Sequence, residues 1–181
     1  MALWIILGLV AVIAIFVVIT YNGLITLKNR VEEAASDIDV QLKRRYELIP
    51  NLVNTVKGYK EYEGGILDKV TKDRAALVTG STAEKIEASN QLTESLKSIF
   101  AVAEAYPDLK ANESFVKLQS DLTDTQDKIM ASQRFYNANV RDFNTKLQVF
   151  PTNLYGQSLG FKPFEFIEAD ETEKANVKVE F

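Results

Sequence analysis

Cysteine and histidine are both absent from the 181 residues of this chain. Without cysteine there is no disulfide, no thiolate metal ligand and no thiol nucleophile. Without histidine the commonest general base and metal ligand of proteins is missing. Carboxylates remain as ligands for calcium or magnesium. Most hydrolase and transition-metal chemistry is nevertheless excluded, so we expect no catalytic activity, no cofactor and no metal.

Proline and glycine are scarce as well, with four and eight residues. Few turn-forming residues predict long, uninterrupted secondary-structure elements. The formal net charge is −4, whereas a nucleic-acid-binding surface is basic, so no nucleic-acid partner is expected. Hydrophobic residues make up 46% of the chain, which is enough for a packed core.

The longest apolar run, from Leu3 to Tyr21, contains no charge, no proline and one glycine. About 19 helical residues span the hydrocarbon core of a bilayer. A cleaved signal peptide would need basic residues before the run, and a core helix of this length would be interrupted by polar residues. The pattern favours a permanent membrane anchor over residues 1–22. Its expected lipid-facing and interfacial residues are Leu3, Trp4, Gly8, Ala11, Phe16 and Tyr21.

Basic residues follow the anchor closely, at Lys28 and Arg30, and only the α-amine precedes it. The positive-inside rule therefore predicts that the C-terminal bulk lies in the cytoplasm. Two charges decide this orientation, so the extracytoplasmic alternative stays open. Lys28 and Arg30 are also the residues expected to contact anionic lipid headgroups.

Apolar residues at spacings of three and four recur through residues 24–42, 52–77, 86–103 and 115–150. They predict an all-α fold, in which the transmembrane helix continues into a long antiparallel bundle of three to four helices over residues 23–150. Pro50 predicts a kink or a restart of the first helix. Ser81 with Glu84 fits a capping box, and Asn112 is a suitable cap for the last helix.

Residues 151–181 differ in character from the bundle. Turn-like sequence with apolar anchors comes first, and Phe164 and Phe166 then alternate with charged residues, as in a short strand or an extended strip on the bundle. An acidic tail follows. The alternating end, Val177 to Phe181, fits either a segment that adds to a sheet edge in a partner protein or a frayed terminus.

Charged residues are densest between Glu32 and Glu47. Paired carboxylates in a pocket can hold a metal or relay a proton. Here acids and bases, among them Arg44 and Arg45, alternate along one helix, where they most easily satisfy one another and water. We therefore interpret the cluster as a solvated helix face.

A second interpretation of polar residues is a layer between helices. Asp37 or Asp39 on the first helix is expected to meet Arg134 or Arg141 on the last, and Asn51 to satisfy backbone groups freed at Pro50. A buried pair of this kind fixes the register between helices rather than adding stability.

Three sequence features belong together: YNGLITLKNRVEEA at residues 21–34, DIDVQLKRRYELIPNLV at 37–53, and the later RFYN, Asn144 and FPTN at 134–153. They resemble the signature of the bacterial LemA family, and the resemblance extends from the anchor to about Phe166. The chain departs from the usual pattern at Ala35, where the family has Trp, and near Glu63, where it has His. The resemblance implies a single-pass protein of the bacterial cytoplasmic membrane with a long helical bundle and no established enzyme activity.

These observations favour a scaffold or adaptor in the bacterial envelope, with the lipid bilayer and a second copy of the chain as partners. Gly8, Ala11 and Ala14 form a small-residue face in the anchor that permits close helix approach. The alternative is a signalling or quality-control accessory that acts through a protein partner at the C-terminal tail.

Overall fold

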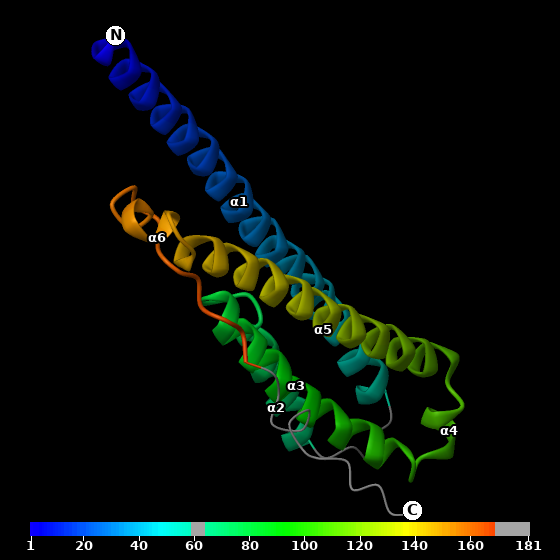
Figure 1. Cartoon of the computed structure of the whole chain (residues 1–181). Helices are drawn as coiled ribbons and strands as arrows, with labels where there is room; N and C mark the ends of the chain where they lie inside the picture. Colours follow the sequence, from blue (N-terminus) through cyan, green and yellow to red (C-terminus); the bar gives the residue numbers. More distant parts are fainter. Residues whose placement is uncertain (59–63, 169–181) are drawn as a thin grey trace, which may run out of the picture. The chain divides into compact units, whose positions relative to one another are not determined.

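Helices account for most of the described chain in this computed structural model, which describes residues 1–58 and 64–168. Their order is α1 (Ala2–Lys57), α2 (Gly64–Ala76), α3 (Thr82–Ala103), α4 (Pro107–Lys110), α5 (Glu113–Gln148) and α6 (Thr152–Tyr155) (Figure 1). No strand occurs in these residues. The predicted all-α fold is confirmed, whereas the acidic tail and the sheet-edge segment lie outside the described residues.

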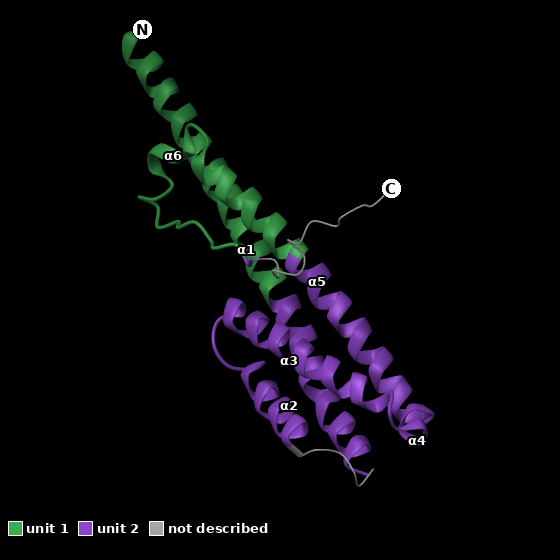
Figure 2. Cartoon of the chain, turned by 90° about the horizontal axis from the view of Figure 1, so that it is seen from below, with its two compact units in different colours: residues 1–35, 134–166 green, residues 36–133, 167–181 purple. Residues whose placement is uncertain are grey.

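The chain divides into two compact units, coloured separately in Figure 2. Unit 1 comprises residues 1–35 and 134–166, and unit 2 comprises residues 36–133 together with residues 167 and 168. Helices α1 and α5 each contribute to both units. The division predicted at residues 22 and 150 stays a prediction.

Helix α1 runs through Pro50 and continues to Lys57. Proline lacks the N–H that would bond to the preceding turn, and a restart was one of its two expected effects. The restart is wrong, because the apolar stripe on both sides of Pro50 is held in one core. Ile49, Leu52 and Val56 are all buried there. A bend at Pro50 stays a prediction.

Unit 2 is a helical bundle whose buried apolar residues follow the spacing of three and four read from the sequence. Its fully buried members include Ile38, Leu42, Ile49, Leu52, Val70, Leu92, Ile99, Leu109 and Ile129. Helix α2 packs along α3, and the Ser95 hydroxyl of α3 donates to the Asp73 carboxylate of α2 at 2.6 Å. Helix α2 also meets α1, because Arg74 lies 3.6 Å from the Tyr46 ring centroid and its Nε donates to the Tyr46 carbonyl.

Local capping groups set the starts of two helices. The Ser81 hydroxyl accepts from the Glu84 N–H, and the Ser81 N–H donates to the Glu84 carboxylate at 2.7 Å. At the start of α5, the Asn112 side-chain oxygen accepts from the Phe115 N–H at 3.1 Å. Both predicted caps are confirmed, and each satisfies N–H groups that a helix terminus otherwise leaves unpaired.

In unit 1, α5 runs antiparallel to α1, and the chain then folds back through α6 into an extended strip (Figure 1). Gly156 makes the fold-back possible, since a Cβ there would lie 2.6 Å from Leu147 and 2.9 Å from the Thr152 carbonyl. The strip is held by Asn144, whose amide donates to the Phe164 carbonyl at 2.9 Å and accepts from its N–H at 3.0 Å. This arrangement is the extended strip that the Phe164–Phe166 alternation predicted.

Candidate functional site

The N-terminal part of α1, in unit 1, contributes no side chains to a protein core. An 18-residue window within it has a mean hydropathy of 3.2, and none of that window is buried. Each of the predicted anchor residues is exposed to the surroundings: Leu3, Trp4, Gly8, Ala11, Phe16 and Tyr21. A core helix of a soluble protein would be mostly buried, so length, composition and exposure together fit a membrane span.

Burial begins at the end of the anchor. Thr20 and Leu24 are both buried in unit 1, about two turns and one turn before Lys28, the first basic residue. Tyr21 contributes an edge-to-face ring contact to Phe161, with centroids 5.6 Å apart. The same helix is therefore apolar and exposed before Thr20 and packed against protein from Thr20 onward.

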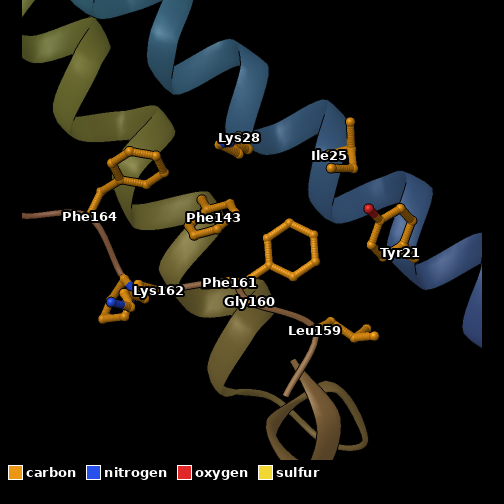
Figure 3. A pocket seen from close by; sticks show the side chains of 10 residues that line it. Tyr21, Ile25, Lys28, Phe143, Leu159, Gly160, Phe161, Lys162 and Phe164 are labelled. Atoms are coloured by element: carbon orange, nitrogen blue, oxygen red, sulfur yellow. The ribbon is translucent and has the colours of Figure 1, made fainter. Parts of the chain in front are cut away.

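An aromatic pocket of about 370 Å³ lies at this point of unit 1. Tyr21, Ile25 and Lys28 of α1 form one wall, Phe143 of α5 another, and residues 159–164 of the strip close it (Figure 3). The ring of Phe161 lies between Phe143 and Tyr21, at centroid distances of 6.2 and 5.6 Å. Lys28 is the only charged residue that α1 contributes to this pocket.

The two basic residues after the anchor differ in their surroundings. Lys28 is half-buried at the pocket, and its ammonium lies 3.5 Å from the Glu32 carboxylate one turn further on. Arg30 is exposed. The Lys28–Glu32 pair is itself solvent-accessible, with side chains 44% and 56% exposed. Contact of Lys28 and Arg30 with headgroups stays a prediction.

The residues of the predicted interhelical polar layer fall in different units. Asp37, Asp39 and Asn51 belong to unit 2, and Arg134 and Arg141 to unit 1, so their mutual pairing stays a prediction. Asp39 does cross between helices, but to Lys85 of α3, at 2.9 Å. Arg141 lies 3.3 Å from its neighbour Asp142, while Asp37, Asn51 and Arg134 are exposed.

A different polar layer occupies the core of unit 2, around Arg45. This side chain is 1% exposed, so its assignment to a solvated face was wrong. Its Nη1 donates to the Ser89 hydroxyl and to the Gln126 amide oxygen, both at 2.5 Å, and its Nη2 donates to the Thr93 hydroxyl at 2.8 Å. The guanidinium of α1 thereby joins α3 and α5.

Sequence spacing contains the signal for this cluster. Arg45 stands three residues after Leu42 and four before Ile49, on the stripe of buried apolar positions. A charged residue at a stripe position is expected to be buried and hydrogen-bonded. Ser89 and Gln126 could not be foreseen as its partners, because they lie 44 and 81 residues away along the chain.

Burial changes the protonation equilibrium of Arg45. Burial lowers the pKa of Arg45 from its usual value to about 10, and Arg45 still carries its proton at neutral pH. Within residues 1–58 and 64–168, no carboxylate forms an ion pair with it. Its Nε and the nearby Gln41 Oε1, one turn earlier on α1, are buried without a hydrogen-bond partner among the described residues.

In the part of the chain that the structure describes, no three His, Cys, Asp or Glu side chains come close enough to hold a metal ion. In the densest charged stretch, from Glu32 to Glu47, Arg45 is buried and the other charged side chains are exposed.

Comparison with known proteins shows which family the chain resembles. The family model described as the LemA family matches residues 34–181. The chain belongs to the LemA family. Membership agrees with the signature residues around Asp37 and Pro50, and with a helical protein that carries one candidate membrane span near its N-terminus.

Individual relatives extend this LemA similarity. Protein LemA of Metamycoplasma hominis is 28% identical over 158 residues, covering 86% of this chain and 72% of the relative. Magnetosome protein MamQ of Magnetospirillum gryphiswaldense is 22% identical over 173 residues, covering 81% of this chain and 64% of the relative. Magnetosome protein MamQ 2 of Paramagnetospirillum magneticum is 23% identical over 190 residues, covering 90% and 70%. This LemA-family chain is thus a membrane-associated helical protein.

Proposed function

We propose that this LemA-family protein is a membrane-anchored scaffold that self-associates through its anchor and holds protein partners at the bacterial envelope without catalysing a reaction. The observation that carries the proposal is the continuity of α1. A single helix from Ala2 to Lys57 includes the membrane span and also supplies core residues such as Ile38 and Leu52. Order in the bundle is therefore transmitted along one helix to the membrane segment.

The Arg45 cluster supports a structural role for the bundle. A charged residue that bonds groups on two other helices disfavours sliding of one helix past another, since every shift in register would leave buried donors unpaired. A bundle with a fixed register presents the same surface to a partner in every copy. This is a property that a scaffold needs.

Self-association is proposed through the small-residue face of the anchor. A Cβ added at Gly8 would meet nothing within 4 Å, so this face is open to a neighbouring helix. Small residues at such spacing let two helix backbones approach closely in lipid. We place the bundle on the cytoplasmic side of the cytoplasmic membrane, in keeping with Lys28 and Arg30.

Disulfide cross-linking in native membranes tests the self-association. We expect Ala11→Cys to form dimers on mild oxidation several times faster than Ile13→Cys, which lies on the opposite side of the helix. The chain has no cysteine of its own, so each variant reports on one position. Monomers only, or equal cross-linking at both positions, would remove self-association from the proposal.

The alternative role, an accessory that signals or performs quality control through its C-terminal tail, depends on residues 169–181. These lie outside the described residues, and no contact of the bundle favours this role over the scaffold. Deleting residues 169–181 without loss of any interaction would retire it.

A further inference from the structure

The corner between α5 and α6 exposes an unusual number of large apolar side chains. Phe150 is 78% exposed and Leu154 is 70% exposed, and Val149 and Leu159 beside them are exposed as well. We call these four residues the corner patch. An exposed apolar cluster of this kind marks a surface that contacts another protein or a membrane.

The corner patch is held in place by buried neighbours. Leu147, Thr152 and Phe161 are buried, and Gly156 lets α6 pack closely against Leu147. The exposure of Phe150 and Leu154 is therefore built into the packing of unit 1. If Phe150 and Leu154 served only to stabilise the fold, they would be expected in the core and not on the surface.

The corner patch belongs to the compact unit that contains the anchor. Because α5 runs antiparallel to α1, its C-terminal end returns toward the membrane-spanning part of α1, and both views place α6 beside that helix (Figures 1 and 2). Two contacts show which part of α1 lies beside the strip that follows the corner. Phe161 touches Tyr21, and Leu159 lines the same pocket as Tyr21. Tyr21 is the residue at which the anchor ends, so the patch lies at the height of the membrane surface.

Charge around the patch fits a phospholipid surface. Between Asp142 and Glu165 the chain has no acidic residue, and it has two lysines, Lys146 and Lys162, both exposed. On α1 the first acidic residue after the anchor is Glu32, four residues beyond Lys28. Basic residues flanking an apolar face are typical of elements that lie in the interface and bind anionic headgroups.

We propose that the corner patch inserts into the leaflet from which the anchor emerges, with Lys146, Lys162 and Lys28 against anionic phospholipid headgroups. The protein then contacts the bilayer at two places, the anchor and the α5–α6 corner. This second contact fixes the tilt and rotation of unit 1 relative to the membrane. It rests on the membrane anchoring and not on self-association.

Depth-dependent quenching tests the insertion in the full chain. Phe150→Cys and Leu154→Cys are labelled with an environment-sensitive fluorophore in nanodiscs of phosphatidylcholine and phosphatidylglycerol, with or without lipids that carry a quencher near the headgroup. Phe135→Cys is the matched control, because Phe135 is 54% exposed on α5, about 20 Å before the end of that helix at the corner. Phe16→Cys in the anchor is the positive control.

We expect at least a twofold loss of fluorescence at positions 150, 154 and 16 on adding quencher lipid, and little change at position 135. The loss at 150 and 154 should diminish when phosphatidylglycerol is replaced by neutral lipid and when Lys146 and Lys162 are both changed to Gln. Circular dichroism of each variant confirms that the helices are retained.

Two results would overturn the proposal. Labels at 150 and 154 that respond like the label at 135, while position 16 is quenched, would leave the anchor intact and the corner in water. Labels that are shielded from water but unaffected by quencher lipid would mean that a second copy of the chain covers the patch. Failure at position 16 would instead refute the anchor itself.

Discussion

Among the described residues, the guanidinium of Arg45 has neutral oxygen atoms around it rather than a carboxylate. Each donor to Ser89, Thr93 or Gln126 replaces a hydrogen bond to water, and burial still opposes the charge, as the lowered pKa of about 10 reports. A buried charge satisfied in this way is sensitive to the loss of any acceptor, because the low-dielectric interior offers no substitute. The cluster therefore discriminates strongly between the native arrangement of α1, α3 and α5 and any shifted one.

Removing one acceptor should destabilise unit 2 more than removing the charge. We expect Gln126→Leu to lower the free energy of unfolding by about 1–3 kcal/mol, since it leaves a buried N–H of Arg45 unpaired. Arg45→Met should cost less, and Gln126→Leu should have little further effect in that background. Urea unfolding followed by circular dichroism in detergent micelles measures all three variants.

The control for this cycle is Gln119→Leu, an exposed glutamine on the same helix, which should change the free energy of unfolding by less than about 0.5 kcal/mol. Strictly additive losses for Arg45→Met and Gln126→Leu would show that the two side chains do not act together.

At the scale of the element, helix starts depend on a few local hydrogen bonds. Those of α3 come from Ser81 and Glu84, whose side chain also accepts from the Ser81 hydroxyl at 2.9 Å. The hydrogen bond from the Ser81 backbone holds the pKa of Glu84 below its usual value. The cap needs the ionised carboxylate, so it weakens in acid.

The pH dependence of this cap has a definite sign. A carboxyl whose pKa is lower in the folded state stabilises the fold above its unfolded-state pKa, and that contribution is lost as pH falls through the folded-state pKa. We therefore expect wild type to be more stable than Glu84→Gln at neutral pH, and the difference to vanish as the pH falls from neutral through the lowered folded-state pKa of Glu84. Unfolding curves of both proteins across this range measure the difference. A gap that stays constant with pH would contradict the role of the charge.

Helix α1 differs from the other helices because one continuous helix contains both an exposed apolar part and a part packed against protein. Up to Ile19 its side chains are apolar and almost all exposed, and from Thr20 onward one stripe is buried against protein. The change occurs without a break in the helix. Signal cleavage behind Thr20 would remove the buried threonine and expose the start of the packed segment.

At the scale of the whole molecule, the anchor defines which compartment the rest of the chain samples. Lys28 and Arg30 predict that unit 2 lies in the cytoplasm. We expect Val116→Cys, exposed on α5 in unit 2, to resist a membrane-impermeant maleimide in intact cells and to react after permeabilisation. Ala2→Cys should react in intact cells.

The reverse labelling pattern would place unit 2 outside the cytoplasm and favour extracytoplasmic partners. Equal labelling of both positions in intact cells would mean that the chain does not span the membrane. Because wild type has no cysteine, it serves as the blank for both variants.

Much of this architecture follows from local sequence. A charge-free run long enough to cross a bilayer, stripes at helical spacing, and caps at Ser81 and Asn112 each depend on residues within a few positions of one another. The same is true of the LemA signature, which is read along the chain. These features were predictable because their physical causes are contained in short windows.

Tertiary structure decided which polar side chains meet. Arg45 is charged, as surface residues usually are, but it stands at a core position. Only the packing of α3 and α5 against α1 supplies its hydrogen-bond acceptors. The ion pair between Asp39 and Lys85, 46 residues apart, likewise depends on how α1 and α3 pack. Sequence thus determined the helices and the anchor, because hydrophobic periodicity is local. Partners across the bundle depended on helix register, which is set jointly by every buried side chain in the core.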